Sequence, residues 1–294
     1  MIYSFLYVLT YSCAAIFIER LYFTISPFFS LLVTASIAII FFNLLNIRSL
    51  KSIYRACWKE KKLWFSVMAT ILVMWVCTMI GPGLIGAALC NFLTSSFLGV
   101  LGLFSLVKKD FKNNRLKFYI GLCIVGLMIV MVANKLEHAF TIHVLVGILA
   151  GFIVGGSGFI YFKQSQLITK RIQLASTQIL AVRFYLTVIV MFAVLPHGSF
   201  ALYATPINLG HLVLLAFLSL IIPLFFQQKA LERISSAQNA IIASLCPACI
   251  ALLQEVIFRN TDLKYIIVYL IYSLLIALPY LVNKVKQRVA LAAT

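Results

Sequence analysis

Lys112-Asn-Asn-Arg-Leu-Lys-Phe-Tyr-Ile120 lies between two long apolar runs near the middle of this 294-residue chain. Half a chain length further on, Arg259-Asn-Thr-Asp-Leu-Lys-Tyr-Ile-Ile267 is again a short polar connector that opens an apolar run. Four of the nine positions are identical. Self-similarity at a fixed offset indicates an internal duplication, so we interpret the chain as two repeats, residues 1–137 and 138–294.

The composition is that of a membrane protein. Hydrophobic residues make up 63% of the chain and charged residues 11%, and the mean hydropathy is +1.07. So much apolar surface exceeds what one core can bury, which makes lipid the expected solvent. The basic excess, 24 Lys and Arg against 7 Asp and Glu, lies between the apolar runs. That is the pattern of cytoplasmic loops beside anionic lipid, and we expect no nucleic-acid partner.

Ten apolar runs are long enough to cross a bilayer. Backbone groups in lipid must be satisfied internally, and ten-residue alternation typical of a membrane β-barrel is missing, so the runs are expected to be helices. The N-terminal run lacks a basic leading segment and is interpreted as a retained span. The predicted spans are 2–18, 27–46, 63–81, 84–106, 116–133, 143–162, 176–196, 209–228, 236–257 and 265–283.

The loop charges give an orientation. The loops after even-numbered spans and the C-terminal tail carry nineteen Lys and Arg residues, whereas the opposite loops carry four. This asymmetry predicts a multi-pass protein of the inner, cytoplasmic membrane with both termini in the cytoplasm. Five spans per repeat is an odd number, so the second repeat must be inverted. The predicted fold is an all-α polytopic membrane protein of ten transmembrane helices in two inverted five-helix repeats.

The segment from Ile47 to Lys62 has two interpretations. Its basic residues recur at helical spacing, with Ile47, Leu50, Tyr54 and Trp58 on another face. That pattern predicts a basic amphipathic helix on the inner leaflet. A simple positively charged loop is the alternative.

Two short motifs match known signatures only by spelling. Gly81-Pro-Gly-Leu-Ile-Gly86 has the spacing of a dinucleotide-binding loop, but no strand precedes it, and we interpret it as a hairpin between spans three and four. Cys246-Pro-Ala-Cys249 has the spacing of a redox motif but lies inside an apolar run that disfavours thiolates. Small residues at a helix contact, with a proline kink, are the preferred interpretation.

Catalytic constellations are missing from the sequence. The seven carboxylates lie in loops or at span ends, and no His, Cys and Asp residues have metal-ligand spacing. We therefore expect no enzyme, no catalytic residue, no metal and no cofactor.

Several residues inside the apolar runs are candidates for a substrate cavity. Arg183 lies about 10 Å along span seven, where it either snorkels to headgroups or faces a hydrated cavity. Asn91 lies in a polar patch of span four, which either bonds to other helices or lines a cavity. Glycines of span six allow close helix contact or leave room for a solute. The predicted cavity residues are Tyr11, Trp75, Asn91, Ser95, Gly155, Tyr161, Arg183 and Phe225.

Together these features resemble the drug/metabolite transporter superfamily, particularly the EamA-like permeases. The matching features are short spans in two halves, Arg183-Phe184 early in span seven, Pro247 in span nine and Glu255 near its end. The resemblance implies transport of amino acids, drugs or other small metabolites through a central cavity. In such families the cavity is usually lined by spans one, three, four, six, eight and nine.

The sequence therefore predicts a secondary transporter that exports small polar or amphipathic metabolites, such as amino acids, by alternating access. A flippase for lipid-linked substrates and a non-transporting membrane scaffold are the alternatives. The expected partners are a small-molecule substrate and anionic lipid of the inner leaflet, and the protein is expected to be a monomer or homodimer. Because no carboxylate lies in mid-membrane, uniport and exchange remain open beside proton coupling.

Overall fold

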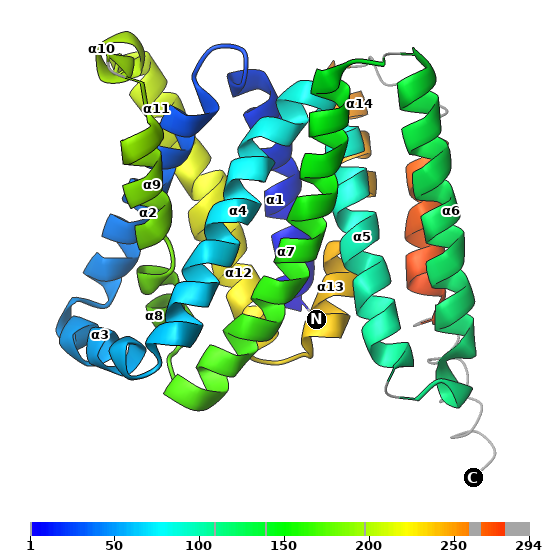
Figure 1. The fold of residues 1–294 in the computed structure, drawn as a ribbon, viewed down its shortest axis with the longest axis horizontal. Coiled ribbons are helices and arrows are strands. Elements are labelled where there is room, and N and C mark those ends of the chain that lie inside the picture. Colours follow the sequence, from blue (N-terminus) through cyan, green and yellow to red (C-terminus); the bar gives the residue numbers. More distant parts are fainter. Residues whose placement is uncertain (1, 109, 139, 197, 259–265, 280–294) are drawn as a thin grey trace.

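The computed structural model describes residues 2–108, 110–138, 140–196, 198–258 and 266–279 (Figure 1). Within these ranges the chain is helical without a strand, and nine helices are long and apolar enough to span a membrane. The prediction of an all-α polytopic membrane protein is confirmed. Part of the predicted tenth span is a shorter apolar helix, Ile266–Pro279. The second connector lies mostly outside the described residues, so the repeat remains a prediction.

Successive long helices run in opposite directions between the two ends of the bundle (Figure 1). Several are apolar around their whole circumference, as membrane spans are. Short segments η1 (Ile47–Ser49), η2 (Lys112–Asn114) and the π-helical η3 (Ala216–Ile221) join or continue the longer helices. The longer elements are α1 (Ile2–Leu21), α2 (Pro27–Leu45), α3 (Leu50–Lys59), α4 (Lys61–Ile85), α5 (Ala87–Val107), α6 (Arg115–His138), α7 (Ile142–Ile172), α8 (Ser176–Val182), α9 (Tyr185–Val194), α10 (Ser199–Tyr203), α11 (Pro206–Leu215), α12 (Ile222–Leu231), α13 (Ser236–Ala243) and α14 (Cys246–Phe258).

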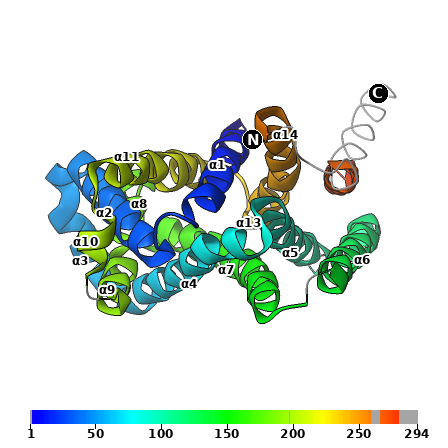
Figure 2. The same ribbon diagram turned by 90° about the horizontal axis from the view of Figure 1, so that it is seen from above.

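The centre of the bundle is formed by helices from both halves of the chain. Helix α4 packs along α7, and α1 packs along α12. Helix α5 contacts α7 and α13, α1 contacts α14, and α2 contacts α8 and α9. Seen from above, α6 lies at one extreme of an elongated bundle and α3 at the other (Figure 2). The core is therefore surrounded by six helices, namely α1, α4, α5, α7, α12 and α13.

Two apolar spans are interrupted where the sequence shows single polar or proline residues. The helix of span seven breaks at Arg183-Phe184, which separates α8 from α9. Span nine breaks at Ser244-Leu245, directly before Pro247 in the first turn of α14. A proline there costs little, because the first turn of a helix needs no backbone donor at that position.

The predicted hairpin between spans three and four is wrong for most of its length. Gly81 to Ile85 continue α4, and the turn occurs at Gly86, whose φ of 87° favours glycine. Pro82 lies inside the helix, where neighbouring helices compensate for its missing donor. A Cβ on Gly83 would lie 2.0 Å from the Tyr22 ring. This glycine therefore allows Tyr22, in the loop between α1 and α2, to pack against α4.

Helix α7 is longer than the predicted span 143–162. It continues to Ile172 and has 31 residues, or about 46 Å at 1.5 Å per residue. That exceeds the roughly 30 Å of a hydrocarbon core, so α7 projects beyond it. Thr141 caps its start through Val144 N at 3.3 Å, and Gln173, at φ 59°, ends it in the left-handed region.

Residues Leu50–Lys59 form helix α3, one of the two predicted alternatives. The helix buries Ile53 and Cys57, and burial raises the pKa of the Cys57 thiol to about 11. Tyr54 Oη donates to Asn43 Oδ1 of α2 at 3.0 Å and is hydrogen-bonded to the Tyr185 hydroxyl of α9. This three-residue cluster fixes α3 against the end of α2 and the start of α9.

Candidate functional site

A small cavity with a mostly apolar lining and several polar side chains lies at the centre of the bundle. Its volume is about 40 Å³, and its walls come from α1, α4, α5, α7, α12, α13 and α14. These helices correspond to the six spans that the resemblance implies. The lining residues are Tyr7, Tyr11, Met74, Trp75, Thr78, Thr94, Ser95, Leu98, Val154, Gly158, Phe162, Leu224, Gln227, Ala243 and Cys246.

Three of the predicted cavity residues line this cavity: Tyr11, Trp75 and Ser95. Trp75 is 1% exposed, and its Nε1 has no hydrogen-bond partner among the described residues. Buried polar atoms are normally paired, so this indole N–H is a free donor in the cavity wall. Tyr7 stacks on Tyr11 with ring centroids 5.5 Å apart, which gives one side of the cavity an aromatic surface.

Three other predicted residues lie outside the lining. The Asn91 amide donates to the Ala87 carbonyl at 2.9 Å, one turn earlier in its own helix. A Cβ on Gly155 would lie 2.5 Å from the Thr94 carbonyl oxygen, so this glycine permits close packing of α7 on α5. Phe225 is half-buried beside Phe226. A role for these three in substrate binding remains a prediction.

Arg183 is fully buried at the break between α8 and α9. It does not snorkel to headgroups, because its exposure is 0%. Its Nη1 donates to the Tyr161 hydroxyl, and its guanidinium carbon lies 4.6 Å from the Phe184 ring centroid. Nε and Nη2 have no partner in the described part of the chain. The structure thus places a cation in the core with two free donors.

A layer of hydrogen bonds connects Arg183 to α12. The Tyr161 hydroxyl donates to Gln228 Oε1 at 3.1 Å, and Ser165 Oγ donates to the same oxygen at 2.7 Å. The Gln228 amide nitrogen is buried and unpaired within the described ranges. Arg183, Tyr161 and Gln228 are not lining residues, but Phe162 and Gln227, which follow Tyr161 and precede Gln228 in the sequence, line the cavity, so α7 and α12 contribute to both the polar layer and the cavity wall.

Sequence reasoning missed Tyr7, Gln227 and Gln228. The signal was present, because adjacent glutamines in an apolar span are costly unless they face protein or water. Tyr7 could not be distinguished from the many other aromatic residues without knowing which face of α1 is turned inward.

The ends of α7, α8 and α12 are tied together beyond the polar layer. Gln166 Nε2 donates to the carbonyls of Leu231 and Ile234, and Ser176 N donates to Glu232 Oε1 at 3.1 Å. Partial burial acts to raise the pKa of Glu232, but hydrogen bonds from Ser176 and Lys229 outweigh it and lower the pKa. These contacts hold one end of the bundle closed.

A polar pocket of about 240 Å³ lies at the other end of the bundle, where α4 meets α5. Glu19 of α1 accepts from the Gln254 amide at 3.1 Å, and Lys135 of α6 also lines this pocket. A carboxylate and an ammonium group therefore face one opening.

A cavity between six membrane-spanning helices, one of which is broken at Ser244-Leu245, is typical of membrane transporters. Residues 141–280 match the model of the EamA-like transporter family, which is part of the drug/metabolite transporter superfamily. This match confirms the resemblance over residues 141–280, and the family implies a membrane transporter of the drug/metabolite type. Members of this family are transporters rather than enzymes. No curated protein matches the chain.

Proposed function

We propose that this protein is a secondary carrier that moves small anionic or zwitterionic metabolites, such as amino acids, out of the cell by alternating access. The main support is Arg183, a buried cation with two free donors that contacts Tyr161 on α7, one of the helices lining the central cavity. A solute with a carboxylate or similar anionic group provides the missing partner.

The energetic argument concerns the cost of burying an unpaired charge. A buried cation normally has a counter-ion, because removing a charge from water is expensive. The two ion pairs among the described residues are Arg171 with Glu60 and Lys229 with Glu232, and neither involves Arg183. The rings of Phe184 and Tyr161 compensate only in part, by cation–π attraction.

The packing of the helices supports a two-fold plan. If α1 is equivalent to α7, and α4 to the span formed by α11, η3 and α12, the contact of α1 with α12 corresponds to that of α7 with α4. In the same way, the contact of α1 with α14 corresponds to that of α7 with α5. Such equivalence is what an inverted repeat requires, and rocking of one repeat against the other is the usual basis of alternating access.

The conformation described here is closed around its cavity. About 40 Å³ holds little more than a water molecule, whereas small-molecule sites usually measure about 300–1,000 Å³. Substrate entry therefore requires one end to open. The Gln166 and Glu232 contacts would part in the cytoplasm-facing state, and the Glu19–Gln254 contact in the opposite state.

The residues that line the central cavity also bear on how transport is driven. No carboxylate is among the described residues that line the central cavity. We propose uniport or exchange of two metabolites, with Arg183 compensated by substrate in each loaded state.

Cysteine accessibility tests the proposed cavity. Ser95→Cys, in a background whose seven native cysteines are replaced, should react with an aqueous maleimide from one side of the membrane at a time. Saturating substrate should slow the reaction. Ala38→Cys in α2, fully buried outside the cavity, is the unreactive control, and Ser52→Cys on exposed α3 is the reactive one. Failure of Ser95→Cys to react from either side refutes a hydrated pathway at this position.

A further inference from the structure

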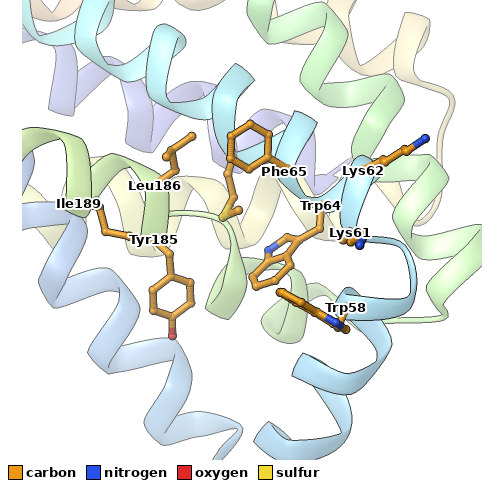
Figure 3. Close-up of a pocket in the computed structure, with 9 residues that line it drawn as sticks. Trp58, Lys61, Lys62, Trp64, Phe65, Tyr185, Leu186 and Ile189 are labelled. Atoms are coloured by element: carbon orange, nitrogen blue, oxygen red, sulfur yellow. The ribbon is translucent and has the colours of Figure 1, made fainter.

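A large apolar pocket lies away from the central cavity, between α3, α4 and α9 (Figure 3). Its volume is about 710 Å³. Figure 3 shows the rings of Trp58 and Trp64 close together, with Tyr185 facing them from α9. The lining residues are Trp58, Lys61, Lys62, Trp64, Phe65, Met68, Tyr185, Leu186 and Ile189.

The pocket combines an apolar wall with a basic rim. Phe65 and Ile189 are 57% and 64% exposed, so their side chains cover one another poorly and leave apolar surface open. Lys61 and Lys62 are exposed at the start of α4, and neither belongs to an ion pair of the described residues. Lys61 Nζ lies 5.9 Å from the Trp58 ring centroid, which places the ammonium group beside the aromatic wall.

The surroundings fit the interface of a bilayer. Tryptophan and lysine are typical of the level where hydrocarbon meets headgroups. Helix α3 adds exposed cations at the same end of the molecule, namely Lys51, Arg55 and Lys59, with Arg48 directly before it. The field of this basic group attracts anions to the mouth of the pocket.

We propose that this pocket binds one anionic phospholipid of the surrounding bilayer. Its phosphate and headgroup lie at Lys61 and Lys62, and an acyl chain lies against Phe65, Leu186 and Ile189. The charge complementarity favours this occupant over a second copy of the chain, since a second copy carries the same excess of positive charge. This site shares no lining residue with the proposed substrate cavity.

The lipid site is connected to the broken helix by one hydrogen bond. Trp64 Nε1 donates to the Val182 carbonyl at 2.9 Å, and Val182 directly precedes Arg183 at the break. A carbonyl at the end of α8 lacks its usual helical partner. A lipid that packs on Trp64 therefore stabilises the residue that satisfies this carbonyl.

The test uses quenching of tryptophan fluorescence by lipids brominated on the acyl chain, with the full-length protein in phosphatidylcholine nanodiscs. Trp58 and Trp64 line the pocket, and Trp75 is buried elsewhere and supplies an unquenched background. Brominated phosphatidylglycerol should reach half-maximal quenching at a mole fraction roughly tenfold lower than brominated phosphatidylcholine. The double variant Lys61→Gln/Lys62→Gln should lose most of that preference.

The control is Lys108→Gln/Lys112→Gln, which removes the same charge from exposed lysines near α5 and η2. It should keep the preference, and light scattering should show no dimer that shields the tryptophans. Equal quenching by both lipids, equal effects of the two double variants, or a dimer that abolishes quenching overturns the proposal. Unchanged melting temperatures of both variants verify that the fold is intact.

Discussion

Replacing Arg183 by glutamine removes the buried guanidinium and leaves a neutral amide, whose nitrogen lies at about the position of the arginine Nε. If Nε or Nη2 donates to an anionic group of the substrate, the substitution deletes at least one charge-assisted hydrogen bond. Such a bond contributes about 1.5–3 kcal/mol. At about 1.4 kcal/mol per tenfold change, KM for a carboxylate substrate should rise roughly 10- to 150-fold.

The assay is counterflow of a labelled amino acid into proteoliposomes, with unlabelled carboxylate and carboxamide forms of the same solute as competitors. In the original protein the carboxylate form should compete far better, and in Arg183→Gln the two forms should compete almost equally. Arg171→Gln is the matched control, because Arg171 is exposed and only weakly paired with Glu60 at 3.9 Å. Its KM should change by less than about twofold, as expected for a surface pair.

The result distinguishes a binding role from a structural one. A buried arginine with unpaired donors contributes little net stability, so the melting temperature of Arg183→Gln should fall by only a few degrees. An equal loss of affinity for the carboxylate and carboxamide forms would falsify the assignment of Arg183 to the anionic group. A large loss of melting temperature with unchanged selectivity would show that the guanidinium serves the fold.

Two further substitutions test the packing and the closed end. Gly155→Ala should destabilise the protein by about 1–3 kcal/mol, because its Cβ would meet the Thr94 carbonyl at 2.5 Å; Gly126→Ala, with nothing within 4 Å, should leave the melting temperature unchanged. Equal melting temperatures for both would contradict the close packing of α7 on α5. Because the pKa of Glu232 is lowered, its contribution to stability is present above the unfolded-state value of about 4.3 and is lost as pH falls through the lowered value. Glu232→Gln should remove this acid-side loss and speed opening at the Ser176 contact, measured by maleimide labelling of nearby cysteines; an unchanged pH profile would contradict the stabilising role.

The sequence predicted the helical membrane architecture because lipid leaves few alternatives for long apolar runs. It placed helix ends less well. The run from Lys61 to Ile85 is apolar beyond Gly81, and nothing local shows that a proline and two glycines remain helical there. The end of α7 was missed for the opposite reason. Lys163 and Lys170 were interpreted as loop residues, whereas both lie on α7, which projects beyond the hydrocarbon core.

The site was predicted only where residue type and burial agree. Trp75 and Ser95 line the cavity, whereas Asn91 satisfies its amide within its own helix. Which side of a uniformly apolar helix faces the cavity depends on the neighbouring helices, and hydrophobic periodicity does not report it. Arg183 was recognised as exceptional from its position in the sequence, but its full burial and its two free donors depend on the break between α8 and α9.

Transport itself is tested by measuring solute flux. Purified protein in proteoliposomes should catalyse saturable exchange of one or more amino acids or related carboxylates from a broad panel. The exchange should be faster than in empty vesicles and should be lost on modification of Ser95→Cys inside the cavity. Absence of saturable flux for every solute on the panel, with protein whose melting curve shows that it is folded, would contradict the proposed carrier of anionic and zwitterionic metabolites.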